Sequence, residues 1–92
     1  MLCAFVLIDA EPARIAALAQ ELTEVDGVAE VYSVTGDPDL VAIVRVRHHD
    51  DLAAVVTAGI ASRPGIVRTR TLVAFQAYSR HDLEAMWDLG AG

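Results

Sequence analysis

Hydrophobic positions recur at two different periods in the first third of the chain and predict a strand followed by a helix. Residues 2–8 are apolar at every position, which favours a strand covered on both faces. Beyond Pro12 the apolar positions recur every three or four residues, which predicts an amphipathic helix that ends near Gly27. The apolar stripe of this helix consists of Ile15, Leu18, Ala19, Leu22 and Val25.

The middle of the chain predicts a hairpin and a second helix. Residues 28–34 and 40–47 form two strands, and residues 35–39 form the turn that joins them. The second helix begins at residues 48–51, where an aspartate is available to cap the first N–H groups, and it stops at the Pro-Gly pair of residues 64–65. The apolar stripe of this helix consists of Leu52, Val55, Val56 and Ile60.

The last elements are a long strand at residues 66–78 and a short amphipathic helix at residues 83–87. The element order β-α-β-β-α-β predicts a ferredoxin-like α+β fold with an antiparallel four-stranded sheet and two helices on one face. The opposite face is apolar at most positions, so we expect a second subunit to cover it, as in a dimeric α+β barrel. We divide the chain into a folded domain, residues 1–79, and a C-terminal helix and tail, residues 80–92.

Composition and charge narrow the class of protein. The 92 residues have a formal net charge of −6, and their basic residues are scattered, so no cationic stripe is present for nucleic acid. Cys3 is the single cysteine, which excludes an internal disulfide and suits a reducing cytoplasm. The apolar run at residues 2–8 is far shorter than the ~20 residues of a membrane span and lacks the pattern of a signal peptide. We therefore expect a cytoplasmic protein that needs no cofactor.

The turn at residues 35–39 concentrates groups that can bind a small polar ligand. Its aspartates can accept hydrogen bonds from an ammonium group, and the backbone N–H groups around Gly36 can donate to a carboxylate, as an amino acid requires. The same residues also suit a plain hairpin turn, because Gly36 tolerates positive φ and Asp37 and Asp39 can bond nearby amides. An exposed charge pair contributes only about 0–1 kcal/mol, so binding would require subunit assembly to exclude water.

Two other polar clusters have simpler interpretations. His48-His49 beside Asp50-Asp51 has no further His or Cys cluster to complete a metal shell, so we interpret it as a solvated helix start. Glu30 can pair with an arginine on the outer sheet face, and such pairs either lie solvated at strand ends or fix the register of a dimer. The arginines concerned are Arg45, Arg47, Arg68 and Arg70.

Two motifs resemble those of a known family. Residues 27–41, with Val-Thr-Gly-Asp-Pro-Asp at the turn, and residues 64–71, Pro-Gly-Ile-Val-Arg-Thr-Arg-Thr, resemble the ligand-binding (RAM) domain of the Lrp/AsnC transcriptional regulators. The resemblance covers residues 2–78 and does not include the helix-turn-helix of full-length members, so the chain resembles a stand-alone version. It implies a homodimer that assembles into rings, commonly octamers, with amino-acid effectors bound between dimers near the turn.

The resemblance also implies a set of ligand-binding residues. Two threonines of the last strand would come from a neighbouring subunit, and Pro38 stands where the family often has an aromatic ring, which leaves the ligand preference open. The set is Tyr32, Thr35, Gly36, Asp37, Asp39, Thr69 and Thr71.

These observations support three hypotheses. The first is a non-enzymatic, homo-oligomeric module that senses an amino acid or similar metabolite and modulates transcription or metabolism through a separate DNA-binding member of the family. The alternative is a small dimeric α+β barrel enzyme of the cofactor-free monooxygenase or isomerase type, which would need a roomy cavity with converging polar groups. The third is a structural interaction protein with a vestigial ligand site.

Overall fold

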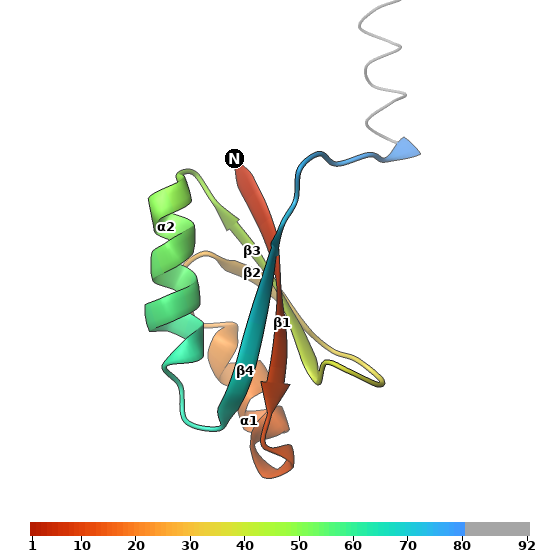
Figure 1. The fold of residues 1–92 in the computed structure, drawn as a ribbon, viewed down its shortest axis with the longest axis vertical. Coiled ribbons are helices and arrows are strands. Elements are labelled where there is room, and N and C mark those ends of the chain that lie inside the picture. Colours follow the sequence, from red (N-terminus) through yellow and green to blue (C-terminus); the bar gives the residue numbers. More distant parts are fainter. Residues whose placement is uncertain (81–92) are drawn as a thin grey trace, which may run out of the picture.

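The computed structural model, which describes residues 1–80, has a four-stranded antiparallel sheet in the order β2-β3-β1-β4 (Figure 1). The central strands are β1 (Leu2–Ala10) and β3 (Leu40–Val46). The edge strands are β2 (Val28–Ser33) and β4 (Ile66–Val73). This order confirms the prediction that the first and third strands lie at the centre of a ferredoxin-like α+β sheet.

Both helical segments lie on the same face of the sheet (Figure 1). Between β1 and β2 the chain forms η1 (Pro12–Arg14) and α1 (Ile15–Leu22). Between β3 and β4 it forms α2 (His49–Ala54), which continues as the π-helix η2 (Val55–Ala61). Pro12 begins η1, a position where its missing N–H costs no helical hydrogen bond. No helix within residues 1–80 is long and apolar enough to cross a membrane.

The expected aspartate cap of the second helix is wrong. His48 is the N-cap residue, and no side-chain hydrogen bond caps α2. Asp50 and Asp51 lie two and three residues after it, in the first turn. At these positions their negative charges interact favourably with the helix dipole.

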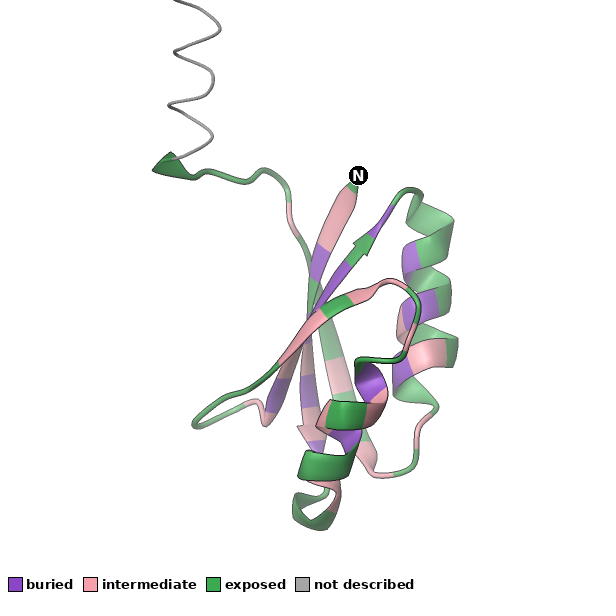
Figure 2. Ribbon diagram, turned by 180° about the vertical axis from the view of Figure 1, so that it is seen from behind, coloured by how far each residue is buried: buried purple, intermediate pink, exposed green. Residues whose placement is uncertain are grey.

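The core lies between the sheet and the helices (Figure 2). Alternate residues of the two central strands point toward α1, α2 and η2, as the period-2 pattern of residues 40–47 predicts. The residues packed in this core, by element, are Ala4, Val6, Ile8 and Ala10 of β1, Leu40, Ala42, Val44 and Val46 of β3, Leu18 and Leu22 of α1, Leu52 of α2, and Val55 and Ile60 of η2.

No element within residues 1–80 covers the opposite face of the sheet, which we call the outer face. Its centre is apolar, and its rim carries the ion pairs Glu30–Arg45, at 3.4 Å, and Asp9–Arg68, at 3.1 Å. The first pair confirms that Glu30 pairs with an arginine on this face. The apolar residues of the outer face are Cys3, Phe5 and Leu7 of β1, Val41 and Ile43 of β3, and Leu72 of β4.

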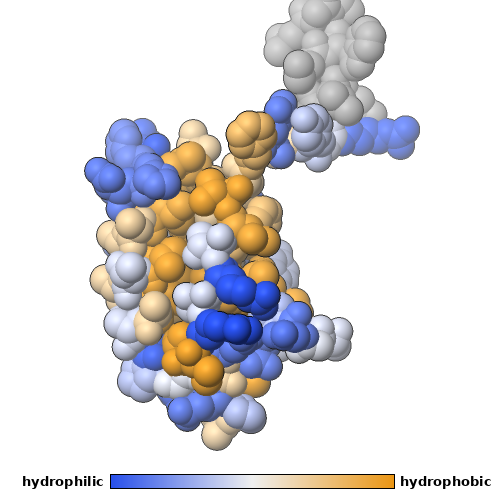
Figure 3. All heavy atoms as spheres, in the orientation of Figure 1, coloured by the Kyte–Doolittle hydropathy of each residue, from blue (hydrophilic) through white to orange (hydrophobic). Residues whose placement is uncertain are grey.

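The last strand is shorter than the sequence predicts. β4 ends at Val73, and the Ala74 N–H donates one further bond to the Cys3 carbonyl at 2.8 Å. Because β1 begins at Leu2, the residues up to Tyr78 have no neighbouring strand within the described part of the chain. Hydrophobic side chains remain on the surface over the upper part of β4 (Figure 3). The helix expected at residues 83–87 lies outside the described residues.

Candidate ligand-binding site

Asp39 holds the turn between β2 and β3 against the end of β1. One carboxylate oxygen, Oδ2, accepts the backbone N–H of Ala10 at 2.9 Å, and the Asp39 N–H donates to the Ile8 carbonyl at 3.0 Å. The Asp39 carbonyl in turn accepts the Val34 N–H at 3.2 Å and closes the turn. Asp39 is therefore a structural residue of the turn, and its second oxygen, Oδ1, is the one left to meet a ligand.

The tip of the turn faces solvent. Gly36 has φ +88°, a conformation that other residues adopt with strain, and a Cβ there would meet no atom within 4 Å. The Asp37 side chain is 76% exposed, and its Oδ1 lies 3.8 Å from the Arg70 guanidinium of β4. Thr35 is also exposed. The tip thus presents a carboxylate, a hydroxyl and backbone amides on a turn that Asp39 anchors, which is the donor and acceptor set that an amino acid requires.

Tyr32 belongs to a polar cluster at the edge of the outer face. Its hydroxyl donates a hydrogen bond to the Glu30 carboxylate, which also accepts from Arg45 at 3.4 Å. The Tyr32 hydrogen bond, and then Arg45, lower the pKa of the Glu30 carboxyl from its usual value, and the same bond raises the pKa of the Tyr32 phenol. The Tyr32 hydroxyl therefore already has a hydrogen-bond partner on the sheet.

Thr69 and Thr71 lie apart from the turn of the same chain. Both are on β4, which β1 separates from β3, and both fall on the sheet face toward the helices. Thr71 lines a cavity of about 270 Å³ between β4 and α2, together with His49 and Val56. Within one chain these threonines are not part of the turn.

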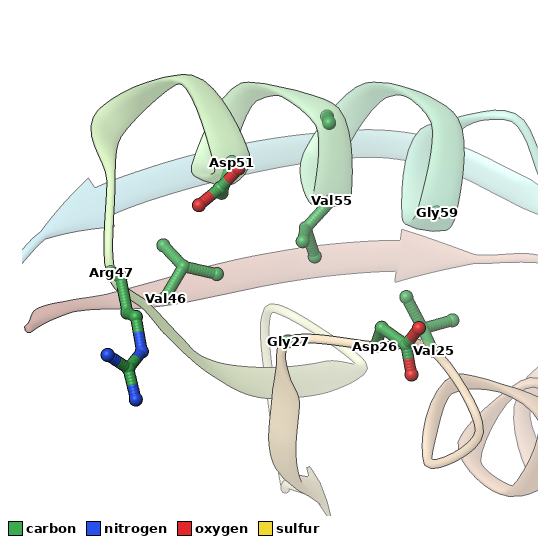
Figure 4. A pocket seen from close by; sticks show the side chains of 9 residues that line it. Val25, Asp26, Gly27, Val46, Arg47, Asp51, Val55 and Gly59 are labelled. Atoms are coloured by element: carbon green, nitrogen blue, oxygen red, sulfur yellow. The ribbon is translucent and has the colours of Figure 1, made fainter.

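A larger cavity of about 430 Å³ lies between the loop that precedes β2 and the helical segment α2–η2 (Figure 4). Sequence reasoning missed it, although Gly27 after the first helix and Gly59 inside the second are the signal that could have indicated it. No group of three or more His, Cys, Asp or Glu side chains within residues 1–80 is arranged to hold a metal ion. The cavity is lined by Val25, Asp26, Gly27, Val46, Arg47, Asp51, Ala54, Val55 and Gly59.

The β-α-β-β-α-β sheet with its anchored polar turn makes this chain a small domain of the α+β class. The model of the Lrp/AsnC ligand binding domain matches residues 3–83, and the chain belongs to this family. The family is one of regulatory domains and not of enzymes, which removes the barrel-enzyme alternative.

Known proteins of this fold include both short and long chains. TTHA0845 from Thermus thermophilus is 52% identical, with a TM-score of 0.82 over 87% of this chain and 100% of its own. The HTH-type transcriptional regulator FL11 of Pyrococcus abyssi is 31% identical over 82% of this chain and 49% of its own length. The feast or famine regulatory protein Rv3291c from M. tuberculosis, in complex with L-methionine, is 28% identical with a TM-score of 0.72, over 87% of this chain and 54% of its own. The chain spans about half the length of the curated relatives it matches.

Proposed function

We propose that this protein is an amino-acid sensor of the cytoplasm that assembles from several copies and binds its effector at the turn between β2 and β3. The observation that carries this proposal is that one residue of the turn fixes its backbone while its other polar groups remain exposed. Asp39 fixes the backbone to β1, while the carboxylate of Asp37 and the amides near Gly36 stay exposed. A site whose frame is fixed and whose polar groups face outward binds without first having to order itself.

The complex of Rv3291c with L-methionine supports an amino acid as the ligand class, since that domain shares this fold. Here the ligand's ammonium group would meet Asp37 and the free oxygen of Asp39. Its carboxylate would meet the amides around Gly36, with Thr35 beside them. Tyr32 of the same chain, and Thr69 and Thr71 of a neighbouring copy, would complete the wall of the site.

Assembly is the second part of the proposal. The apolar centre of the outer face exposes 37% of Phe5 and 55% of Leu72, and a second copy with the same face would bury both. The ion pairs at the rim would then set the register of the two sheets. Dimers would join into a larger ring, an octamer by resemblance to the family, and a DNA-binding relative would receive the signal.

The experiment is native mass spectrometry at fixed protein concentration, with and without each of the twenty amino acids. We expect one ligand to shift the assembly or raise its thermal stability, and we expect Asp37→Asn to abolish that response. Asp37 is the right position because its substitution leaves the Asp39 anchor intact, and Asp50→Asn is the matched control on an exposed helix start. An assembly indifferent to all twenty amino acids would favour the structural interaction protein instead.

The outer face is tested separately by light scattering. Leu72→Lys places a charge in the apolar centre and is expected to convert the assembly into monomers. Val73→Lys is the control, because Val73 is 47% exposed but pairs with the buried Ala4 and so lies on the face toward the helices. Equal behaviour of the two variants would contradict pairing through the outer face.

A further inference from the structure

The smaller cavity, of about 270 Å³, is an apolar groove between the helical segment α2–η2 and the C-terminal half of β4, and we call it the α2–β4 groove. Hydrophobic side chains show at the surface there, and among the described residues that line it none is a carboxylate or a guanidinium (Figure 3). An apolar cavity of about 150 Å³ can hold a benzene molecule, so the groove has room for one large apolar side chain. The lining consists of His49, Leu52, Ala53, Val56, Thr57, Thr71 and Val73.

The groove stays open when two copies pair through the outer face, because it lies on the other side of the sheet. β4 is an edge strand, so within residues 1–80 no further strand lies beside it. Val73 is nearly half exposed, although it pairs with Ala4, which is fully buried. The described part of the chain therefore leaves the end of β4 apolar and uncovered on the side toward the helices.

The course of the chain brings its C-terminal segment within reach of this groove. β4 ends at Val73, which itself lines the groove, and it ends where α2 begins (Figure 1). Residues 74–82 connect Val73 to the helix that the sequence predicts at residues 83–87, and at ~3.3 Å per residue they span up to about 30 Å. The groove follows α2–η2 from His49 to Thr57, a rise of about 12 Å. The connection is long enough to return the predicted helix to the groove of its own chain.

The sequence of this segment supplies an apolar face that the domain does not use. Leu83, Met86 and Trp87 recur at spacings of three and four residues, which places them on one face of a helix. Met86 and Trp87 lie beyond residue 83, where the match to the Lrp/AsnC ligand binding domain ends. The match to the family therefore gives these two large side chains no role.

We propose that residues 83–89 form a helix that docks in the α2–β4 groove of their own chain, with Trp87 as the side chain that fills it. The apolar face of the helix meets the apolar walls, and the threonine hydroxyls at positions 57 and 71 offer acceptors for the indole N–H. A docked segment covers Thr71, so the segment and a neighbouring copy cannot both contact that residue. This last consequence alone rests on the proposed function.

Trp87 is the single tryptophan of the 92 residues, so tryptophan fluorescence reports on this segment alone. In the full chain we expect its emission maximum to lie at a shorter wavelength than in the urea-unfolded chain, and we expect protection from quenching by acrylamide. Both should be independent of protein concentration and should persist in Leu72→Lys, because docking within one chain needs no second copy. The measurement contains no amino acid, so its failure leaves the proposed function standing.

Two matched pairs of variants locate the contact. Ala53→Glu places a carboxylate in the groove and should move the emission to that of the unfolded chain, whereas Ala58→Glu, at an exposed residue outside the groove lining, should not. Leu83→Asn should expose Trp87 in the same way, and Ala85→Asn, on the opposite side of the predicted helix, should not. Circular dichroism checks that each variant keeps the fold. If Ala53→Glu unfolds the domain, Leu83→Asn decides, because it leaves the groove and the core residues unaltered.

Three results would overturn the docking. An emission maximum of the native chain equal to that of the unfolded chain would show that Trp87 lies in water. A shift that disappears on dilution or in Leu72→Lys would place Trp87 between copies. Equal effects of Ala53→Glu and Ala58→Glu would show that Trp87 is buried away from the α2–β4 groove.

Discussion

Replacing Gly27 by alanine perturbs a close approach between the loop before β2 and the helix η2. The new Cβ would lie 2.7 Å from Cγ2 of Val55 and 3.2 Å from Cγ1 of Val46, both of them core residues. The backbone there has φ +97°, which alanine adopts only with strain. The loop cannot simply move away, since the Gly27 carbonyl accepts the Arg45 N–H at 2.8 Å.

The expected cost has two parts. Positive φ costs a residue with a Cβ roughly 1–2 kcal/mol, and overpacking a filled core costs roughly a further 1–3 kcal/mol. Gly36→Ala isolates the first part, because Gly36 has φ +88° and its Cβ would meet no atom within 4 Å. Gly27→Ala should therefore lower the free energy of unfolding by roughly 1–3 kcal/mol more than Gly36→Ala does.

The assay is urea unfolding at one fixed protein concentration, because self-association changes apparent stability. Val55→Ala removes the clashing methyl group, and the Cβ of residue 55 lies 3.8 Å away, an ordinary contact. In that background Gly27→Ala should cost what Gly36→Ala costs plus the smaller cost of the remaining 3.2 Å contact with Val46, a coupling of up to about 1–3 kcal/mol. Strictly additive effects of the two substitutions would refute the steric argument.

Two further predictions concern the turn and the outer face. Tyr32→Phe removes the hydrogen bond that lowers the pKa of Glu30, so carboxyl ¹³C titration should show that pKa rising toward its ordinary value, and an unchanged titration would contradict the assignment. Because folding lowers that pKa, ionised Glu30 stabilises the fold at pH values above its unfolded pKa, and this stabilisation is lost as the pH falls through its folded pKa. Tyr32→Phe should therefore reduce the stability that is lost on acidification. Asp39→Ala leaves the Ala10 N–H without its acceptor and should lower stability in thermal unfolding by about 1–3 kcal/mol, whereas Asp39→Asn, which keeps an oxygen acceptor, and Asp37→Asn should each cost under about 1 kcal/mol.

The sequence by itself determined the order of the elements and the faces of the central strands. Alternation within residues 40–47 assigns four side chains to the core, and all four are buried there. Such patterns are local, because side-chain direction repeats every two residues in a strand and every 3.6 in a helix. The identities of neighbouring residues are therefore enough to predict which face each side chain occupies. The turn at residues 35–39 is also predictable from the sequence, because glycine tolerates positive φ and aspartate side chains bond nearby backbone amides.

The tertiary structure alone decided which polar groups are engaged and where the chain leaves space. That Asp39 accepts the Ala10 N–H depends on a contact across 29 positions, and the end of β4 depends on where β1 begins. The larger cavity likewise combines three separate segments, with Asp26, Arg47 and Asp51 about its rim. Spacing along the chain does not predict such contacts, because they form only when the strand register and the helix packing bring distant residues together.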